Sequence, residues 1–111
     1  MQTGPPSVTA LSTAKCRAIH QLDDVPVVHV DPLAVRIVGG DPREPGYRES
    51  LIYRLRGAVV ARSRYTEDCI ARAVAGGVRR VVTLGAGLDT YALRNPYPGV
   101  EVIEIDHPAT Q

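Results

Sequence analysis

The chain has 111 residues, 44% of them hydrophobic, and a formal net charge of only +1 from 13 basic and 12 acidic residues. This balance leaves no overall field that would attract nucleic acid or an anionic membrane, so we expect a small-molecule partner. No apolar stretch approaches the roughly 18 residues of a membrane span, and the N-terminus lacks the pattern of a secretion signal, which together favour a cytoplasmic protein.

The first half of the chain predicts helices separated by loops that contain Pro and Gly. Apolar residues recur at helical spacing over residues 8–22, with a helix start near Ser7 or Thr9. A second helix of about two turns is expected to begin at Asp31-Pro32 and to end near Val38, because Asp caps a first turn and Pro is tolerated just inside it.

Two further stretches with helical periodicity cover residues 47–61 and 65–75. Gly76-Gly77 is a strong stop signal at the end of the second stretch. We therefore assign residues 1–77 to an N-terminal helical region that covers the binding site of the following domain.

The pattern changes from helix to strand after this point. Residues 78–84 form a β-branched run typical of a buried parallel strand, and residues 100–106 form a second one. Between them, residues 90–95 are long enough for a short helix. The fold class predicted is α/β, with residues 78–111 as the first β-α-β unit of an incomplete Rossmann-like sheet.

A glycine turn and an acid follow these strands in the order that a nucleotide site requires. Gly85-Ala86-Gly87 follows the first strand directly, and such a turn lets a ligand approach the backbone while the free N–H groups of the following helix point at it. Asp106 ends the second strand 21 positions after Gly85, close to the usual spacing of about 20 for an acid that binds the ribose hydroxyls. Glu104 has the same orientation in the strand and is the alternative ribose ligand.

The turn does not match a dinucleotide fingerprint, because Thr90 stands where the third glycine is expected. An adenosine ligand without a pyrophosphate fits better. A nicotinamide-dependent oxidoreductase nevertheless remains the first alternative, and a non-catalytic truncated product the second.

Three ordered motifs resemble one known family. They are Ala-Arg-Ser-Arg-Tyr-Thr-Glu-Asp at 61–68, Leu-Gly-Ala-Gly-Leu-Asp-Thr at 84–90 and Glu-Ile-Asp-His-Pro at 104–108. Together with residues 18–22 and 31–34, they resemble the leucine carboxyl methyltransferase-like superfamily, in particular its bacterial branch of O-methyltransferases linked to polyketide biosynthesis. The resemblance implies a class I methyltransferase whose cofactor is S-adenosyl-L-methionine and which acts on oxygen.

The resemblance also implies roles for individual residues. The turn Gly85-Ala86-Gly87 would pass under the methionyl and ribose parts of the cofactor, and Asp106 would hold the ribose hydroxyls. An arginine of the 61–64 segment would bind the cofactor carboxylate, with Arg62 the first choice and Arg64 the second. Asp89 would support the turn or the cofactor ammonium group, and His107 would line the pocket beside Asp106.

Other polar residues have simpler interpretations. An ion pair with Glu67 or Asp68 is the structural alternative for Arg62. Cys16 and His20 have the spacing of metal ligands, but without a second pair of ligands nearby we expect no metal.

The short length suggests an incomplete enzyme. Residues 107–108 resemble the opening of another helix, and the adenine pocket, the acceptor site and any general base are expected in strands and helices beyond it. We therefore expect this chain alone to bind the cofactor weakly, to transfer no methyl group, and to self-associate through unpaired sheet edges. The acceptor would be a carboxylate, which needs no base at neutral pH, or a hydroxyl.

Overall fold

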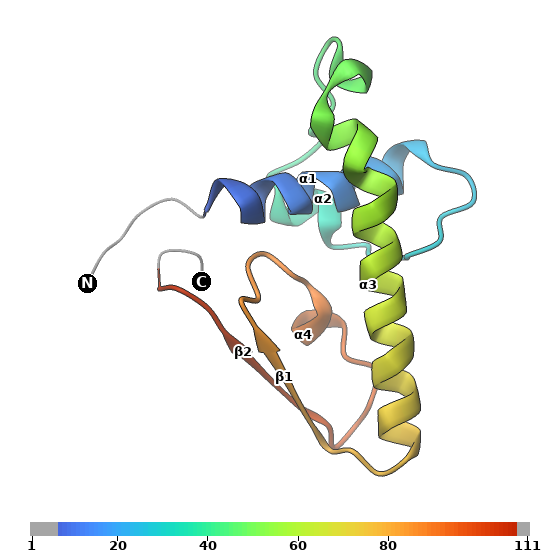
Figure 1. Cartoon of the computed structure of the whole chain (residues 1–111), viewed down its shortest axis with the longest axis vertical. Helices are drawn as coiled ribbons and strands as arrows, with labels where there is room; N and C mark the ends of the chain where they lie inside the picture. Colours follow the sequence, from blue (N-terminus) through green and yellow to red (C-terminus); the bar gives the residue numbers. More distant parts are fainter. Residues whose placement is uncertain (1–6, 109–111) are drawn as a thin grey trace.

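A computed structural model describes residues 7–108, in which helices precede a β-α-β unit (Figure 1). The helices are α1 (Val8–Asp23), α2 (Ala34–Ile37), the 3-10 helix η1 (Tyr47–Glu49), α3 (Leu51–Ala75) and α4 (Tyr91–Arg94). The strands are β1 (Arg80–Leu84) and β2 (Glu101–Ile105). The predicted α/β class is confirmed, whereas the helix expected to open at residues 107–108 falls largely outside the described residues.

Helix α1 begins where the sequence predicts. The side chain of Ser7 caps it by accepting a hydrogen bond of 3.0 Å from the backbone N–H of Ala10. Ala14, Ala18 and Ile19 are at most 2% exposed, and they lie on the helix that contacts both α2 and α3. The core of the described residues therefore lies on α1.

Helix α3 corrects the prediction of two separate helices over 47–61 and 65–75. It runs unbroken for 25 residues, because residues 61–65 contain no Pro or Gly that would interrupt the backbone hydrogen bonds. Ser50 caps its start by accepting from the N–H of Tyr53, and residue 47 lies in η1 instead. The predicted stop at Gly76 is confirmed.

Strands β1 and β2 pair in parallel, in a register that runs from Arg80 opposite Glu101 to Leu84 opposite Ile105. Parallel pairing places the carboxyl ends of both strands at the same edge of the sheet. Figure 1 shows the strand pair beside the second half of α3, with this edge directed towards α1. The glycine turn after β1 and Asp106 after β2 therefore meet there.

No helix in the described part of the chain combines the length and the apolar character that crossing a membrane would need.

Candidate functional site

The turn after β1 depends on both of its glycines. Gly85 has a φ of +63° and Gly87 a φ of +58°, which is the left-handed region that side chains disfavour. A Cβ on Gly87 would lie 3.3 Å from the Cβ of Ala10, whereas nothing lies within 4 Å of a Cβ on Gly85. Gly87 thus allows the turn to approach α1, and Gly85 leaves open space beside the backbone.

Asp106 is hydrogen-bonded directly to the backbone of this turn. Its Oδ2 accepts a hydrogen bond from the N–H of Gly87, and its Oδ1 accepts one of 2.6 Å from the N–H of His107. A carboxylate has about four acceptor positions, so these two bonds orient the group and leave capacity for two hydroxyls. The turn and the acid, which the sequence separates, form one site.

The N–H groups of the three turn residues are all used within the protein. The N–H groups of Gly85 and Ala86 donate to the carbonyl of Ile105, at 2.7 and 3.3 Å, and that of Gly87 donates to Asp106. These donors join the ends of the two strands. A ligand here would instead contact the open Cα side of the turn.

A pocket of about 370 Å³ lies beside the turn, and we call it the α3 pocket. One wall consists of α3 residues at helical spacing: Val59, Arg62, Ser63, Thr66, Glu67 and Ile70. At about 1.5 Å per residue, this wall is about 16 Å long. Residues 83–86, Asp89 and Tyr91 face it, and Thr13 and Arg17 of α1 contribute as well.

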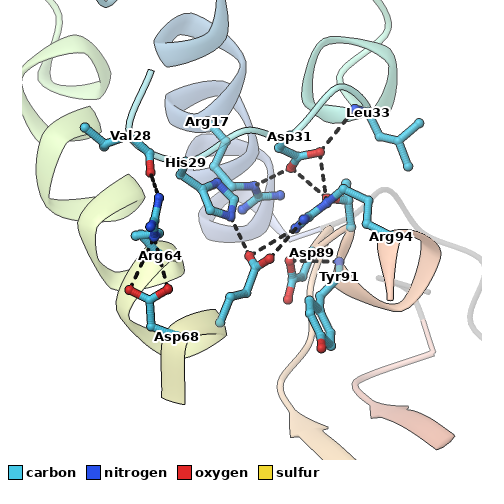
Figure 2. Close-up of polar contacts among 12 residues, drawn as sticks. Arg17, Val28, His29, Asp31, Leu33, Arg64, Asp68, Asp89, Tyr91 and Arg94 are labelled. Carbon is cyan, nitrogen blue, oxygen red and sulfur yellow. Dashed lines mark hydrogen bonds and ion pairs between the residues drawn. The ribbon is translucent and has the colours of Figure 1, made fainter. Parts of the chain in front are cut away.

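The structure places Arg62 and Arg64, the two candidates for binding the cofactor carboxylate, in different surroundings. Arg62 lines the α3 pocket, and within residues 7–108 it has no hydrogen bond or ion pair with another side chain. Arg64 lies outside the pocket lining, with its guanidinium bonded to Asp68 and to the carbonyl of Val28 (Figure 2). The alternative ion pair of Arg62 with Glu67 or Asp68 is not formed, because both acids bind other partners.

The remaining predicted residues occupy different positions. Asp89 lines the pocket and its Oδ1 accepts from the N–H of Tyr91 at 3.3 Å, so it supports the turn into α4. His107 is exposed and does not line the α3 pocket. Glu104 is half-buried and also outside the pocket lining, and burial, with the nearby charge of Asp89, raises its pKa.

A buried polar network holds the turn against the N-terminal helices, and sequence reasoning missed it. The carboxylate of Asp31, fully buried, accepts from the hydroxyl of Thr90 at 2.6 Å and lies 3.3 Å from Arg94 Nε and 3.8 Å from Arg17 Nε. Figure 2 shows these groups converging from α1, the loop before α2 and the segment around α4. Arg17 also donates to the carbonyl of Leu88 at 2.6 Å.

Glu67 extends this network to α3. It accepts hydrogen bonds from both terminal nitrogens of Arg94 and contacts His29 Nε2. Burial alone would raise the pKa of Glu67, but the hydrogen bonds from His29 and Arg94 outweigh it and lower this pKa to about 2. Glu67 is therefore a fixed negative charge in the wall of the α3 pocket at neutral pH.

The potential metal ligands of α1 have other partners. Cys16 Sγ donates to the carbonyl of Ile52, and His20 is bonded to Asp24 and to the N–H of Val28. Among residues 7–108, no group of three or more His, Cys, Asp or Glu side chains is arranged to hold a metal ion.

Comparison with known proteins confirms the resemblance noted in the sequence. The profile of the leucine carboxyl methyltransferase family matches residues 10–111. A relative from Frankia alni is 36% identical over 108 residues, which are 88% of this chain and 37% of the relative. A relative from Saccharopolyspora erythraea is 36% identical over 111 residues, 91% of this chain and 37% of its own.

A relative from Mycobacterium tuberculosis is 38% identical over 117 aligned positions, with 90% of this chain and 37% of the relative covered. All three relatives are named S-adenosyl-L-methionine-dependent methyltransferases. The chain thus spans 37% of the length of each of these curated relatives.

Proposed function

The chain belongs to the leucine carboxyl methyltransferase family, and we propose that it binds S-adenosyl-L-methionine for methyl transfer to oxygen of a small molecule. The observation that carries this proposal is the hydrogen bond between Gly87 and Asp106, which unites the glycine turn and the acid at the shared edge of two parallel strands. The methyl acceptor is a carboxylate or a hydroxyl.

The residues present fit this cofactor. Asp106 has acceptor positions left for the two ribose hydroxyls, and the open space beside Gly85 admits a ligand close to the backbone. Arg62 has no side-chain partner among the described residues, and its planar guanidinium suits the cofactor carboxylate. The ribose would lie by Asp106 and the methionyl part in the α3 pocket.

The cofactor supplies a methyl group on a positively charged sulfur. The protein has to align the acceptor oxygen with that carbon, which is a task of positioning that needs no covalent intermediate. Arg62 and Asp106 would fix the two ends of the cofactor. No catalytic residue is assigned among the described residues. A carboxylate acceptor would need no general base, whereas a hydroxyl acceptor would benefit from one.

The family favours this function over a nicotinamide-dependent oxidoreductase. Thr90, at the place of a third glycine, is fully buried and bonded to Asp31, so it has a structural role that a glycine would not provide. A non-catalytic product remains the alternative that an assay of methyl transfer has to exclude.

The pairing of several arginines with acidic residues favours a small-molecule acceptor over nucleic acid. Arg56, Arg64 and Arg80 are each paired with an acid, so part of the positive charge is compensated within the protein. We further propose the cytoplasm as the location, where the two free cysteines would remain reduced.

The test is a titration of the ¹⁵N-labelled chain with S-adenosylhomocysteine up to millimolar concentration, followed by NMR. We expect shifts of the amides of Gly85, Gly87 and Arg62, and none with NADH. Arg62→Gln should weaken binding by about 10-fold or more, the value of a charge-assisted hydrogen bond, whereas Arg64→Gln should change it little. Shifts with NADH alone, or equal effects of the two variants, would contradict the proposal.

A further inference from the structure

Some buried polar atoms within residues 7–108 have no hydrogen-bond partner: Arg17 Nε, His29 Nδ1 and the hydroxyl of Tyr91. A buried polar atom without a partner has lost its hydrogen bonds to water without replacing them, so each of these atoms needs an explanation. Arg17 and Tyr91 line the α3 pocket, and His29 does not.

The protein itself accounts for Arg17 and for His29. Arg17 lies 3.8 Å from the carboxylate of Asp31 and its terminal nitrogen donates to Leu88, so the guanidinium is held by the buried network. His29 uses its other ring nitrogen for Glu67. Neither explanation applies to the hydroxyl of Tyr91, which is the single polar atom of its side chain.

Tyr91 is placed to meet a ligand. It is the first residue of α4, two positions after Asp89, and the residue is only 5% exposed although it lines the pocket. In Figure 2 its ring points away from the cluster around Asp31. Burial, with smaller contributions from Tyr97 and Glu67, raises its pKa, so the hydroxyl is protonated and can donate at neutral pH.

The lining of the pocket indicates which part of a ligand Tyr91 would meet. Arg62, Gly85 and Tyr91 belong to the lining, whereas Gly87 and Asp106 do not. If Asp106 holds the sugar, the pocket receives the opposite end of the cofactor, which carries a carboxylate and an ammonium group.

We propose that the hydroxyl of Tyr91 donates a hydrogen bond to the amino-acid end of the cofactor in the α3 pocket, and so discriminates cofactors by that end. This inference rests on the proposed function, because it assumes that the nucleoside lies at Asp106. It adds a binding residue that the glycine turn, the acid and the arginine do not include.

The test compares two ligands and two variants in the full chain by NMR titration. S-adenosylhomocysteine has the amino-acid end, and 5′-methylthioadenosine lacks it while keeping the adenosine and the sulfur. Tyr91→Phe should weaken binding of the first ligand about 3- to 10-fold, the effect of one hydrogen bond, and leave the second unchanged. The matched variant Tyr65→Phe removes the same atom from a residue that is 67% exposed and outside the pocket, and it should change neither affinity.

A direct measurement accompanies the affinities. In wild-type protein labelled at tyrosine ¹³Cζ, the Tyr91 signal should shift with S-adenosylhomocysteine and stay in place with 5′-methylthioadenosine. Unchanged affinity of Tyr91→Phe for S-adenosylhomocysteine, or equal losses for both ligands, would overturn the role of Tyr91 while leaving the proposed function intact. Failure of the wild type to bind either ligand would overturn both.

Discussion

At the scale of single residues, the site depends on backbone conformations that glycine alone adopts easily. Gly87 combines a φ of +58° with close contact to Ala10 of α1 and a hydrogen bond to Asp106. A side chain at this position would both strain the backbone and press against α1. The turn therefore tolerates substitution less well than a glycine elsewhere in the chain.

Gly87→Ala should lower the free energy of unfolding by about 1–2 kcal/mol, the cost of a left-handed conformation with a Cβ. Gly57→Ala is the matched control, since Gly57 lies inside α3 with nothing within 4 Å of a Cβ and should gain about 0.5–1 kcal/mol. Urea denaturation of both variants measures this difference, and equal effects would argue against the conformation of the turn.

Glu67 makes the stability of the protein depend on pH. Its pKa in the folded state is lowered to about 2, so the stability it contributes is present above its unfolded pKa and is lost as the pH falls towards 2. Glu67→Gln should therefore flatten the loss of stability between about pH 5 and pH 2. Asp68→Asn, which removes an exposed pair with Arg64, should leave most of that loss in place. Urea midpoints measured at several pH values test this. If the midpoint changed with pH to the same extent in the wild type and in Glu67→Gln, the prediction would be refuted.

The meeting of Gly85, Gly87 and Asp106 was predictable, because the order strand, turn, helix and strand determines which strand ends lie together. The partners of Asp31 were not predictable in this way. Asp31 and Thr90 are 59 positions apart, and the sequence shows only a helix cap in one and a missing glycine in the other. Their hydrogen bond depends on how α1 and the loop before α2 are packed.

At the scale of elements, α3 decides which side chains reach the pocket. Arg62 and Arg64 differ by two positions, which are about 200° apart around a helix, so they face opposite sides. The sequence indicated an arginine in this segment, but the choice required the position of α3 relative to β1. The same uncertainty led to the prediction of two helices, since periodicity alone does not show whether neighbouring stretches are continuous.

The Asp31 network connects α4 to α1 and α3, through Arg94, Arg17 and Glu67. Asp31→Asn removes the charge that faces both Arg17 and Arg94, and should lower the free energy of unfolding by about 3 kcal/mol, as expected when a buried ion pair loses one partner. Asp41→Asn removes an exposed partner of Arg43 and should cost much less, because solvent screens the pair. Chemical denaturation compares them, and an Asp31→Asn protein as stable as Asp41→Asn would contradict a structural role for the network.

At the scale of the whole molecule, the sheet leaves apolar side chains in contact with solvent. Val82, Leu84 and Ile105 are between 48% and 76% exposed, and among the described residues β1 and β2 pair only with each other. Open strand edges and exposed apolar residues favour association between chains. Self-association through this sheet therefore remains our proposal for the chain in solution.

Sedimentation velocity should show a mass that increases with protein concentration. Val82→Lys should reduce this association, because a charge on the exposed face opposes strand pairing between chains. Val8→Lys, at an exposed apolar residue of α1, is the control and should leave it unchanged. A monomer at all concentrations, or equal effects of the two variants, would remove the proposal.

The central claim is that one cofactor spans Asp106 and the α3 pocket. A crystal structure of the protein with S-adenosylhomocysteine tests it most directly. We predict ribose hydroxyls on the carboxylate of Asp106 and the ligand carboxylate on the guanidinium of Arg62. A ligand bound away from the glycine turn, or with its ribose and its carboxylate on residues other than these two, would contradict the claim.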